Sequence, residues 1–174
     1  KKDVEQSLNW AGKYLVRSVK GDGSFVYNYD PILDRESRDY NLVRHAGTVF
    51  AMLELYRRNR DSELLGAAER AIGYLLRQVK DGTVRGQAVK FVVENGDTKL
   101  GGNALAVLAL AEYERATGDG RYRQTMRGLG EWILATQAPD GRFTVHKQTV
   151  PEGKVSKFQS EYYPGEAIFA LMRV

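Results

Sequence analysis

Two stretches of the chain carry apolar residues on one side of a helix and charged residues on the other. They are residues 61–78 (DSELLGAAERAIGYLLRQ) and 119–137 (DGRYRQTMRGLGEWILATQ), in which apolar positions recur at helical spacing. This pattern predicts two surface helices, each with one face in the core. Asp61 and Asp119 stand at the starts of these stretches, where an aspartate side chain can cap the free N–H groups of the first turn.

Three further stretches are apolar on nearly every side. They cover residues 45–55, 100–110 and 163–172. They align without gaps on a glycine near the start of each stretch, so that small and aliphatic positions coincide. A helix that is apolar all round is buried all round, and Pro164 suits the first turn of such a helix. We therefore expect three inner helices that alternate with the outer ones.

A recurring turn separates each outer helix from the next inner one. Residues 14–25, 74–84 and 132–143 each combine an aromatic and aliphatic helix end with Asp-Gly, and their leading aromatic residues are about 60 residues apart. Glycine after aspartate supplies the positive φ that ends a helix and reverses the chain. Long connections with alternating strand-like patterns follow, at 24–29, 89–93 and 142–146. Connections of this length in a domain are usually functional.

These elements predict an all-α fold. Three helical hairpins in one domain, residues 1–174, would be joined by short β-hairpin connections at one end and by plain short loops at the other. Hairpins of this kind, arranged side by side, form a partial or open ring. Its two terminal hairpins would expose apolar flanks.

Composition and charge narrow the classes of function. Of the 174 residues 43% are hydrophobic and 28% charged, which is typical of a globular protein. No apolar run approaches the roughly 20 residues of a membrane span, and the net charge of +4 is dispersed, so we expect neither a membrane span nor a nucleic-acid partner. The chain has no cysteine, and its two histidines are far apart. We therefore expect no metal and no cofactor, while the compartment stays open.

The turn Gln137-Ala-Pro-Asp-Gly-Arg-Phe143 resembles the Gln-and-aromatic repeat turn of terpenoid cyclases, and Thr117-Gly-Asp119 precedes an outer helix. Together with the alternating helices, these features resemble the α/α-toroid proteins. That architecture includes six-hairpin glycosidases, polysaccharide lyases, sugar epimerases and the terpenoid-cyclase and prenyltransferase toroids. The resemblance extends over nearly the whole chain, identifies no single family, and implies a central cavity at the starts of the inner helices.

The sequence departs from these proteins in two respects, which change the function and the assembly that we expect. The chain has no Asp-x-Asp-Asp motif and no cysteine for a transferase zinc site, which leaves the carbohydrate-active branch of the resemblance. Three hairpins are also fewer than a closed toroid contains. We therefore expect the chain to be part of a longer toroid, completed by further hairpins, or to assemble with a second copy.

Polar residues at the starts of the predicted inner helices are the candidate site. We assign catalytic roles to His45 and Glu166. The candidate substrate-binding residues are Arg44, Tyr40, Thr48, Asn103, Tyr162 and Tyr163. A histidine suits proton transfer near neutral pH, an arginine can hold a carboxylate through two hydrogen bonds, and tyrosines stack on sugar rings.

Each of these residues also has a structural interpretation. His45 could cap or pack against a helix, and Arg44 could form an ion pair with Asp39 or Glu36. Glu166 suits the positive end of its helix without any catalytic role. A glycosidase needs two opposed carboxylates, and spacing alone assigns no such pair.

Three hypotheses of function follow. The first is a domain that acts on or binds a glycan or a uronic-acid-containing polysaccharide, and as an enzyme it would be a glycoside hydrolase, polysaccharide lyase or sugar epimerase. The second is a non-catalytic toroid module that binds a glycan or a protein partner, and it predicts an aromatic groove without opposed carboxylates. The third is an isoprenoid cyclase or transferase, against which the polar candidate residues argue.

Overall fold

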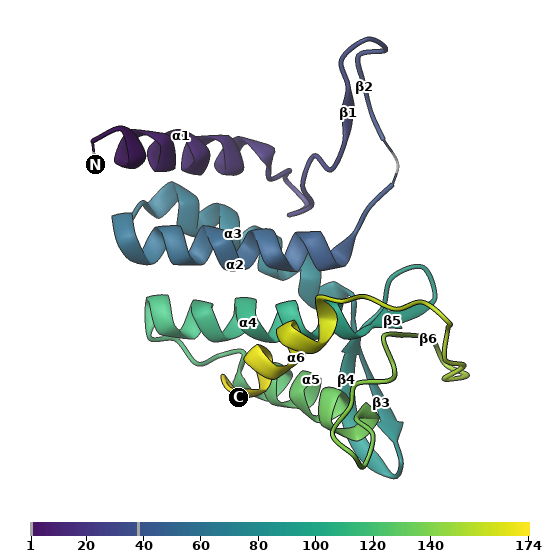
Figure 1. Ribbon diagram of the computed structural model, residues 1–174. Helices are drawn as coiled ribbons and strands as arrows, with labels where there is room; N and C mark the ends of the chain where they lie inside the picture. The colour runs from purple at the N-terminus through teal and green to yellow at the C-terminus, as the bar shows by residue number, and fades with distance from the viewer. Residues whose placement is uncertain (1, 38) are drawn as a thin grey trace.

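Three helices lie side by side and form the centre of the structure (Figure 1). The computed structural model describes residues 2–37 and 39–174. The central helices are α2 (Leu42–Asn59), α4 (Leu100–Thr117) and α6 (Tyr163–Leu171), with α4 packed between the other two. Since α5 and strand β4 contact α4 as well, α4 is covered on nearly all sides.

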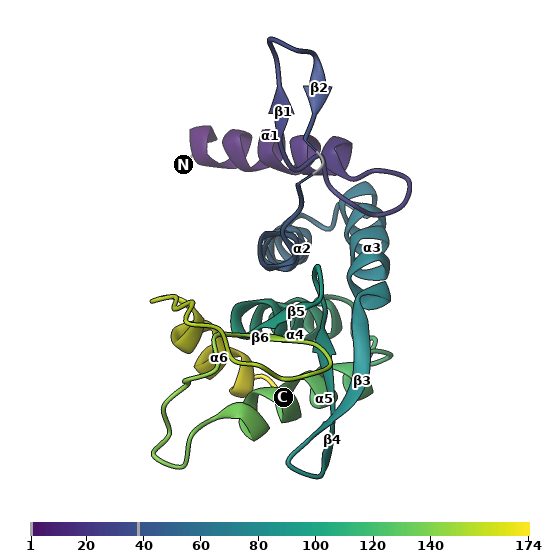
Figure 2. The same ribbon diagram turned by 90° about the vertical axis from the view of Figure 1, so that its right-hand side faces the viewer.

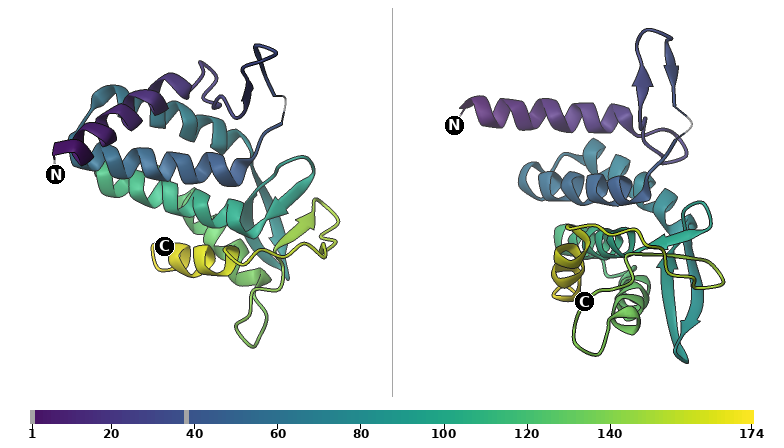
Figure 3. Two further views of the ribbon diagram at one scale, coloured as in Figure 1. Left: turned by 45° about the horizontal axis from the view of Figure 1, so that its top comes forward. Right: turned by 45° about the vertical axis from the view of Figure 1, so that its right-hand side comes forward.

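Three other helices lie outside this row. They are α1 (Lys2–Ser18), α3 (Ser62–Arg77) and α5 (Arg123–Thr136). Helix α3 packs on α2 and contacts α1, whereas α5 packs on α4. Helix α1 therefore lies at one end of the molecule and α5 at the other, with α6 beside α4 (Figure 2, Figure 3).

The capping prediction is confirmed for α3 and wrong for α5. The Asp61 carboxylate accepts hydrogen bonds from the backbone N–H groups of Glu63 at 2.9 Å and Leu64 at 3.3 Å, as an N-cap does. Helix α5 begins four residues later than the sequence pattern indicated, and its N-cap is Tyr122. The Asp119 carboxylate instead closes the preceding turn by accepting the N–H of Arg121 at 2.9 Å.

Three two-stranded antiparallel sheets join the helices. Their strands are β1 (Tyr29–Asp30), β2 (Arg35–Glu36), β3 (Val79–Val84), β4 (Gln87–Val92), β5 (Asp97–Lys99) and β6 (Lys147–Thr149). In the β3–β4 hairpin, Val84 pairs with Gln87 across a two-residue turn with positive φ at both central positions. Strand β5 pairs with β6, so the segment before α4 is joined to the connection between α5 and α6.

The expected all-α class is wrong, because the fold is mixed α/β with six helices and three two-stranded sheets among the described residues. The pattern at 89–93 falls largely in β4, whereas those at 24–29 and 142–146 lie mostly outside strands. A strand forms only where another segment offers backbone partners. The partner of β5 lies about 50 residues away in sequence, beyond the reach of a local pattern.

The recurring Asp-Gly turn is confirmed at two of its three positions. Gly23 and Gly141 both adopt a φ of 86° in reversing turns. The third pair, Asp81-Gly82, lies inside β3, and the chain reverses later at Arg85 and Gly86. A Cβ built on Gly82 would lie 2.5 Å from the Phe91 ring. This glycine therefore makes room for a cross-strand aromatic residue instead of a turn.

Burial all round is found for α4 and not for the other central helices. Helix α6 exposes Ile168 and Phe169, and α2 exposes Ala51. Helix α4 differs because neighbouring elements cover most of its faces. Among the described residues, no helix combines the length and apolar character that a bilayer crossing requires.

Two adjacent glycines in the first turn of α4 provide a test of this packing. A Cβ at Gly101 would lie 2.4 Å from the Tyr163 ring, whereas one at Gly102 would make only ordinary contacts, the nearest at 3.8 Å. We expect Gly101→Ala to lower the free energy of unfolding by about 1–3 kcal/mol through overpacking. Gly102→Ala should be neutral or raise it by up to about 1 kcal/mol.

Denaturant unfolding of both variants measures the difference. Equal effects of the two substitutions would show that α6 does not pack closely on the start of α4.

Candidate functional site

A cavity of about 210 Å³ opens between the end of α1 and the start of α2. Its walls come from α1, the segment after the first Asp-Gly turn, and the first two turns of α2. Four of the residues proposed from the sequence line it, namely Tyr40, Arg44, His45 and Thr48. The structure therefore brings half of the proposed site residues together.

The start of α2 positions the polar residues of this cavity. Asn41 is the N-cap, and its side-chain oxygen accepts the N–H of Arg44 at 3.0 Å. The backbone N–H of Leu42, the first residue of α2, donates to the Glu94 carboxylate. These two hydrogen bonds fix the start of α2. Arg44 and His45 are consecutive residues of this helix, so their side chains point in different directions. The Arg44 side chain is exposed, and His45 is only 2% exposed.

A chain of hydrogen bonds runs from Phe25 through Tyr40 and His45 to α3. The N–H of Phe25 donates to the Tyr40 hydroxyl oxygen at 2.8 Å, and that hydroxyl lies 2.7 Å from His45 Nδ1. His45 Nε2 lies 2.9 Å from the carbonyl oxygen of Ala71. Since a carbonyl only accepts, Nε2 carries the proton, and Nδ1 then accepts from Tyr40. The histidine is therefore held as a neutral ring with both nitrogens engaged.

Burial keeps both members of this pair uncharged at neutral pH. It lowers the pKa of His45 to about 4 and raises the pKa of Tyr40 to about 12. A base at neutral pH needs a free lone pair and a pKa near the working pH, and His45 has neither. These contacts favour a positioning role for His45, which fixes the Tyr40 ring in the cavity wall.

Aromatic rings form one side of the cavity and pack against further rings behind it. The ring centroids of Tyr27 and Tyr40 are 5.7 Å apart, those of Tyr40 and Tyr74 5.4 Å, and those of Phe25 and His45 5.0 Å. Such distances are typical of tilted and edge-to-face aromatic pairs. The rings brace one another, so the cavity has a rigid aromatic side.

Arg44 supplies the positive charge of the cavity. Its Nη1 donates to the Tyr27 hydroxyl at 2.7 Å, and its guanidinium lies 5.5 Å from the Tyr27 ring centroid. The ion pairs considered from the sequence are not formed, because Glu36 pairs with Lys20. Within residues 2–37 and 39–174, no carboxylate lies at ion-pair distance from Arg44. The remaining N–H groups of the guanidinium are thus available to an anion.

Thr48 lies one turn further along α2. Its hydroxyl donates to the Arg44 carbonyl at 2.9 Å, a bond within the helix, and Thr48 lines the cavity. None of the residues that line the cavity is an aspartate or a glutamate. The site thus combines aromatic rings, hydroxyls and one cation, without an acidic group.

Asn103, predicted to bind substrate, makes structural contacts in the fold. This side chain is completely buried, accepts the N–H of Val92 at 2.9 Å, and donates to Thr98 Oγ1 at 2.9 Å and to the Lys99 carbonyl at 2.8 Å. Its amide oxygen and its amide nitrogen are both engaged, and these hydrogen bonds connect the start of α4 to β4 and β5. Asn103 is a polar residue within an apolar stretch of the sequence, and these structural hydrogen bonds explain its presence there.

The other predicted residues lie at the start of α6 and do not line the aromatic cavity. Tyr162 is 78% exposed, whereas the Tyr163 ring packs against Gly101. Glu166 is half-buried, and its Oε2 has no hydrogen-bond partner among the described residues. Burial raises the pKa of Glu166. The structure therefore does not place Glu166 with His45 in one site.

A second acidic group lies in the same region as Glu166. Burial raises the pKa of Tyr163, and the nearby charges of Glu166 and Glu94 raise it further. Glu94 also accepts a hydrogen bond from the Lys99 ammonium group. Only the fold shows that Glu94 lies near the start of α6.

Sequence reasoning missed Tyr14, Phe25 and Tyr27 as cavity residues. Phe25 and Tyr27 belong to the alternating stretch 24–29, which indicated one shared face. Tyr14 was interpreted only as the end of an outer helix. That these three residues meet depends on how the first Asp-Gly turn folds back over α2.

Comparison of the chain with models of known protein families and with curated proteins found no match. Among the described residues, no group of three or more His, Cys, Asp or Glu side chains could hold a metal ion. The geometry of the aromatic cavity is therefore the evidence on function.

The buried state of His45 predicts a specific pH dependence of stability. Its pKa is about 4 in the folded chain and 6.5 in the reference state, so the unfolded chain binds the proton more readily. The contribution of neutral His45 to the free energy of unfolding is fully present above pH 6.5 and is lost as the pH falls toward 4. The loss amounts to about 3 kcal/mol of unfolding free energy.

Urea unfolding between pH 4 and pH 7 should show this slope in the native chain and a shallower slope in His45→Gln. Identical slopes in the two proteins would contradict the buried neutral histidine.

Glu166 should give stability the opposite pH dependence to that given by His45. Because its pKa is raised above 4.5 in the folded chain, the folded state holds the proton more tightly, and stability falls as the pH rises through the folded pKa. We expect Glu166→Gln to raise the melting temperature at pH 7 and to bring no gain at pH 4. Glu161→Gln, at an exposed position on the same connection, is the matched control. A gain from Glu166→Gln that is equal at both pH values would exclude a buried charge as its cause.

Proposed function

We propose that the aromatic cavity binds a glycan that contains uronic-acid units. The observation that carries this proposal is the guanidinium of Arg44, which has no carboxylate partner among the described residues and lies over the Tyr27 ring at the edge of an aromatic wall. Aromatic faces stack on sugar rings, and a guanidinium binds a carboxylate through paired hydrogen bonds. The hydroxyl of Thr48 adds a polar contact of the kind sugars use.

The geometry supports binding better than bond cleavage at this position. Glycoside hydrolysis needs two carboxylates on opposite sides of the scissile bond, and the cavity is lined by none. His45, the base proposed from the sequence, is neutral and engaged at both nitrogens. Of the hypotheses drawn from the sequence, the non-catalytic module is therefore the one we adopt.

The size of the cavity limits what it holds. At about 210 Å³ it is smaller than the roughly 300–1,000 Å³ typical of sites that enclose a drug-sized ligand. A single sugar unit with its carboxylate fits this description, with the rest of the glycan extending over the surface. The proposal therefore predicts recognition of one charged unit within a longer chain.

Calorimetry with oligogalacturonate and with its fully methyl-esterified form tests the proposal, because the two ligands have the same sugar chain and esterification removes the negative charge of the carboxyl groups. We expect binding of the acidic form, and a loss of about tenfold or more in affinity for Arg44→Gln, since a charge-assisted hydrogen bond contributes about 1.5–3 kcal/mol. Tyr27→Ala should weaken binding of both forms.

Lys154→Gln removes an exposed positive charge outside the cavity and is the matched control. The proposal is wrong if neither oligosaccharide binds. It is also wrong if Arg44→Gln and Lys154→Gln have the same effect.

A further inference from the structure

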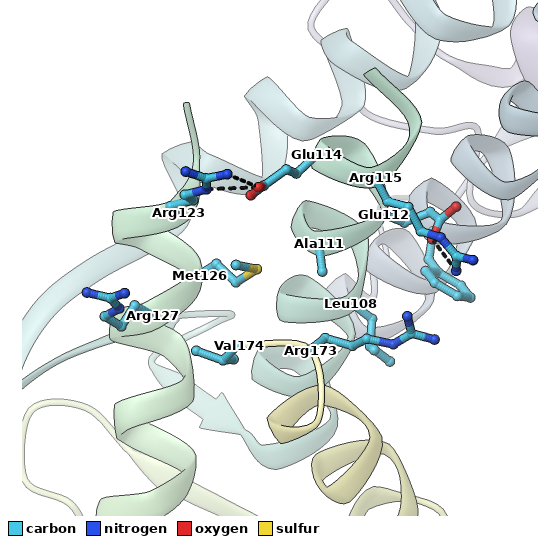
Figure 4. Close-up of a pocket in the computed structure, with 11 residues that line it drawn as sticks. Leu108, Ala111, Glu112, Glu114, Arg115, Arg123, Met126, Arg127, Arg173 and Val174 are labelled. Atoms are coloured by element: carbon cyan, nitrogen blue, oxygen red, sulfur yellow. Dashed lines mark hydrogen bonds and ion pairs between the residues drawn. The ribbon is translucent and has the colours of Figure 1, made fainter. Parts of the chain in front are cut away.

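A second and larger cavity lies away from the aromatic one. It has a volume of about 410 Å³ and forms a groove over the C-terminal half of α4, between α5 and the residues that follow α6 (Figure 4). Leu108 and Ala111 from α4 form its floor, with Met126 and Val174 beside them. The centre of the groove is therefore apolar.

The packing of the helices explains why this strip of α4 is open. Helices α5 and α6 both pack closely on α4 but touch each other little. The small side chain of Ala111 leaves the strip between them shallow and half-exposed. An apolar strip of this kind, bounded by two helices, has the shape into which a third helix packs.

Arginines lie on both sides of this floor. Arg123 and Arg127 belong to α5 on one side, and Arg115 and Arg173 lie on the other (Figure 4). Helix α5 has no acidic residue in its first turn to offset them. The four guanidinium groups are separated by the apolar centre and do not converge on one point.

The acidic residues of the groove neutralise only part of this charge. Glu114 binds Arg123, and Glu112 accepts from Arg57 at 2.8 Å with Arg115 at 3.8 Å. In the part of the chain that the structure describes, no carboxylate lies at ion-pair distance from Arg127 or Arg173. Each side of the groove therefore offers one guanidinium without an acidic partner.

We propose that this groove binds an amphipathic helix of another polypeptide, with an apolar stripe flanked by acidic residues. The apolar stripe would cover the floor, as in other helix-in-groove complexes. Acidic side chains on its two flanks would pair with Arg127 and Arg173, which gives the complex its specificity. Cations on both sides of an apolar centre favour such a helix over a small anion, which would need them to converge.

Two synthetic helical peptides test this proposal. They share one leucine stripe and carry either glutamates or lysines on both flanks. Fluorescence anisotropy should show that the acidic peptide binds and the basic one does not. The double variant Arg127→Glu/Arg173→Glu should weaken the acidic peptide at least tenfold and allow the basic peptide to bind.

The double variant Lys154→Glu/Lys157→Glu makes the same change in net charge at exposed positions outside the groove, and it should preserve the preference for the acidic peptide. Ala111→Trp, which fills the floor at a half-exposed position, should abolish binding without lowering the melting temperature. Equal binding of both peptides, binding of neither, or a charge reversal without effect overturns the proposal.

Discussion

Helix α4 carries apolar side chains around its whole circumference, so a different neighbour has to exclude water from each of its sides. Helices α2 and α6 cover two sides, and α5 with β4 covers much of the rest. Burying one large aliphatic side chain contributes roughly 1.5–3 kcal/mol, and α4 buries several. Gly101 lets the Tyr163 ring approach the start of the helix. The placement of α2, α5, α6 and β4, and of the groove between α5 and α6, follows from this requirement.

The polar residues at the starts of the central helices fall into two kinds. His45 and Asn103 are buried and have every polar group paired, so they tie connections to helices. Arg44 and Glu166 retain polar atoms without a partner among the described residues. Because an unpaired buried polar group is costly, full pairing is the ordinary condition for a structural residue. Glu166 departs from this condition at a half-buried position, whereas Arg44 is exposed and can bind an anion from solution.

Charge that is dispersed along the sequence is concentrated by the fold. The net charge of +4 is spread over the chain without a basic block. In the folded molecule, Arg44 is the charged group of one cavity, and Arg127 and Arg173 flank the other. Both places combine arginine with apolar or aromatic surface. This combination favours acidic partners with an apolar face, a sugar acid at one site and a helix at the other.

Local patterns in the sequence were enough to predict the amphipathic outer helices, the Asp61 cap and two of the three Asp-Gly turns. These features depend on residues within a few positions of one another. Four candidate residues at the start of α2 were also found, because helix starts are local. Only the tertiary structure decided that β5 pairs with β6, that Gly82 lies under Phe91 in a strand, and that His45 is enclosed. Each of these outcomes depends on a partner outside the local helix or turn pattern: β6 lies about 50 residues from β5, the Phe91 ring comes from the strand opposite Gly82, and Ala71 of α3 contacts His45. The tertiary packing places these partners.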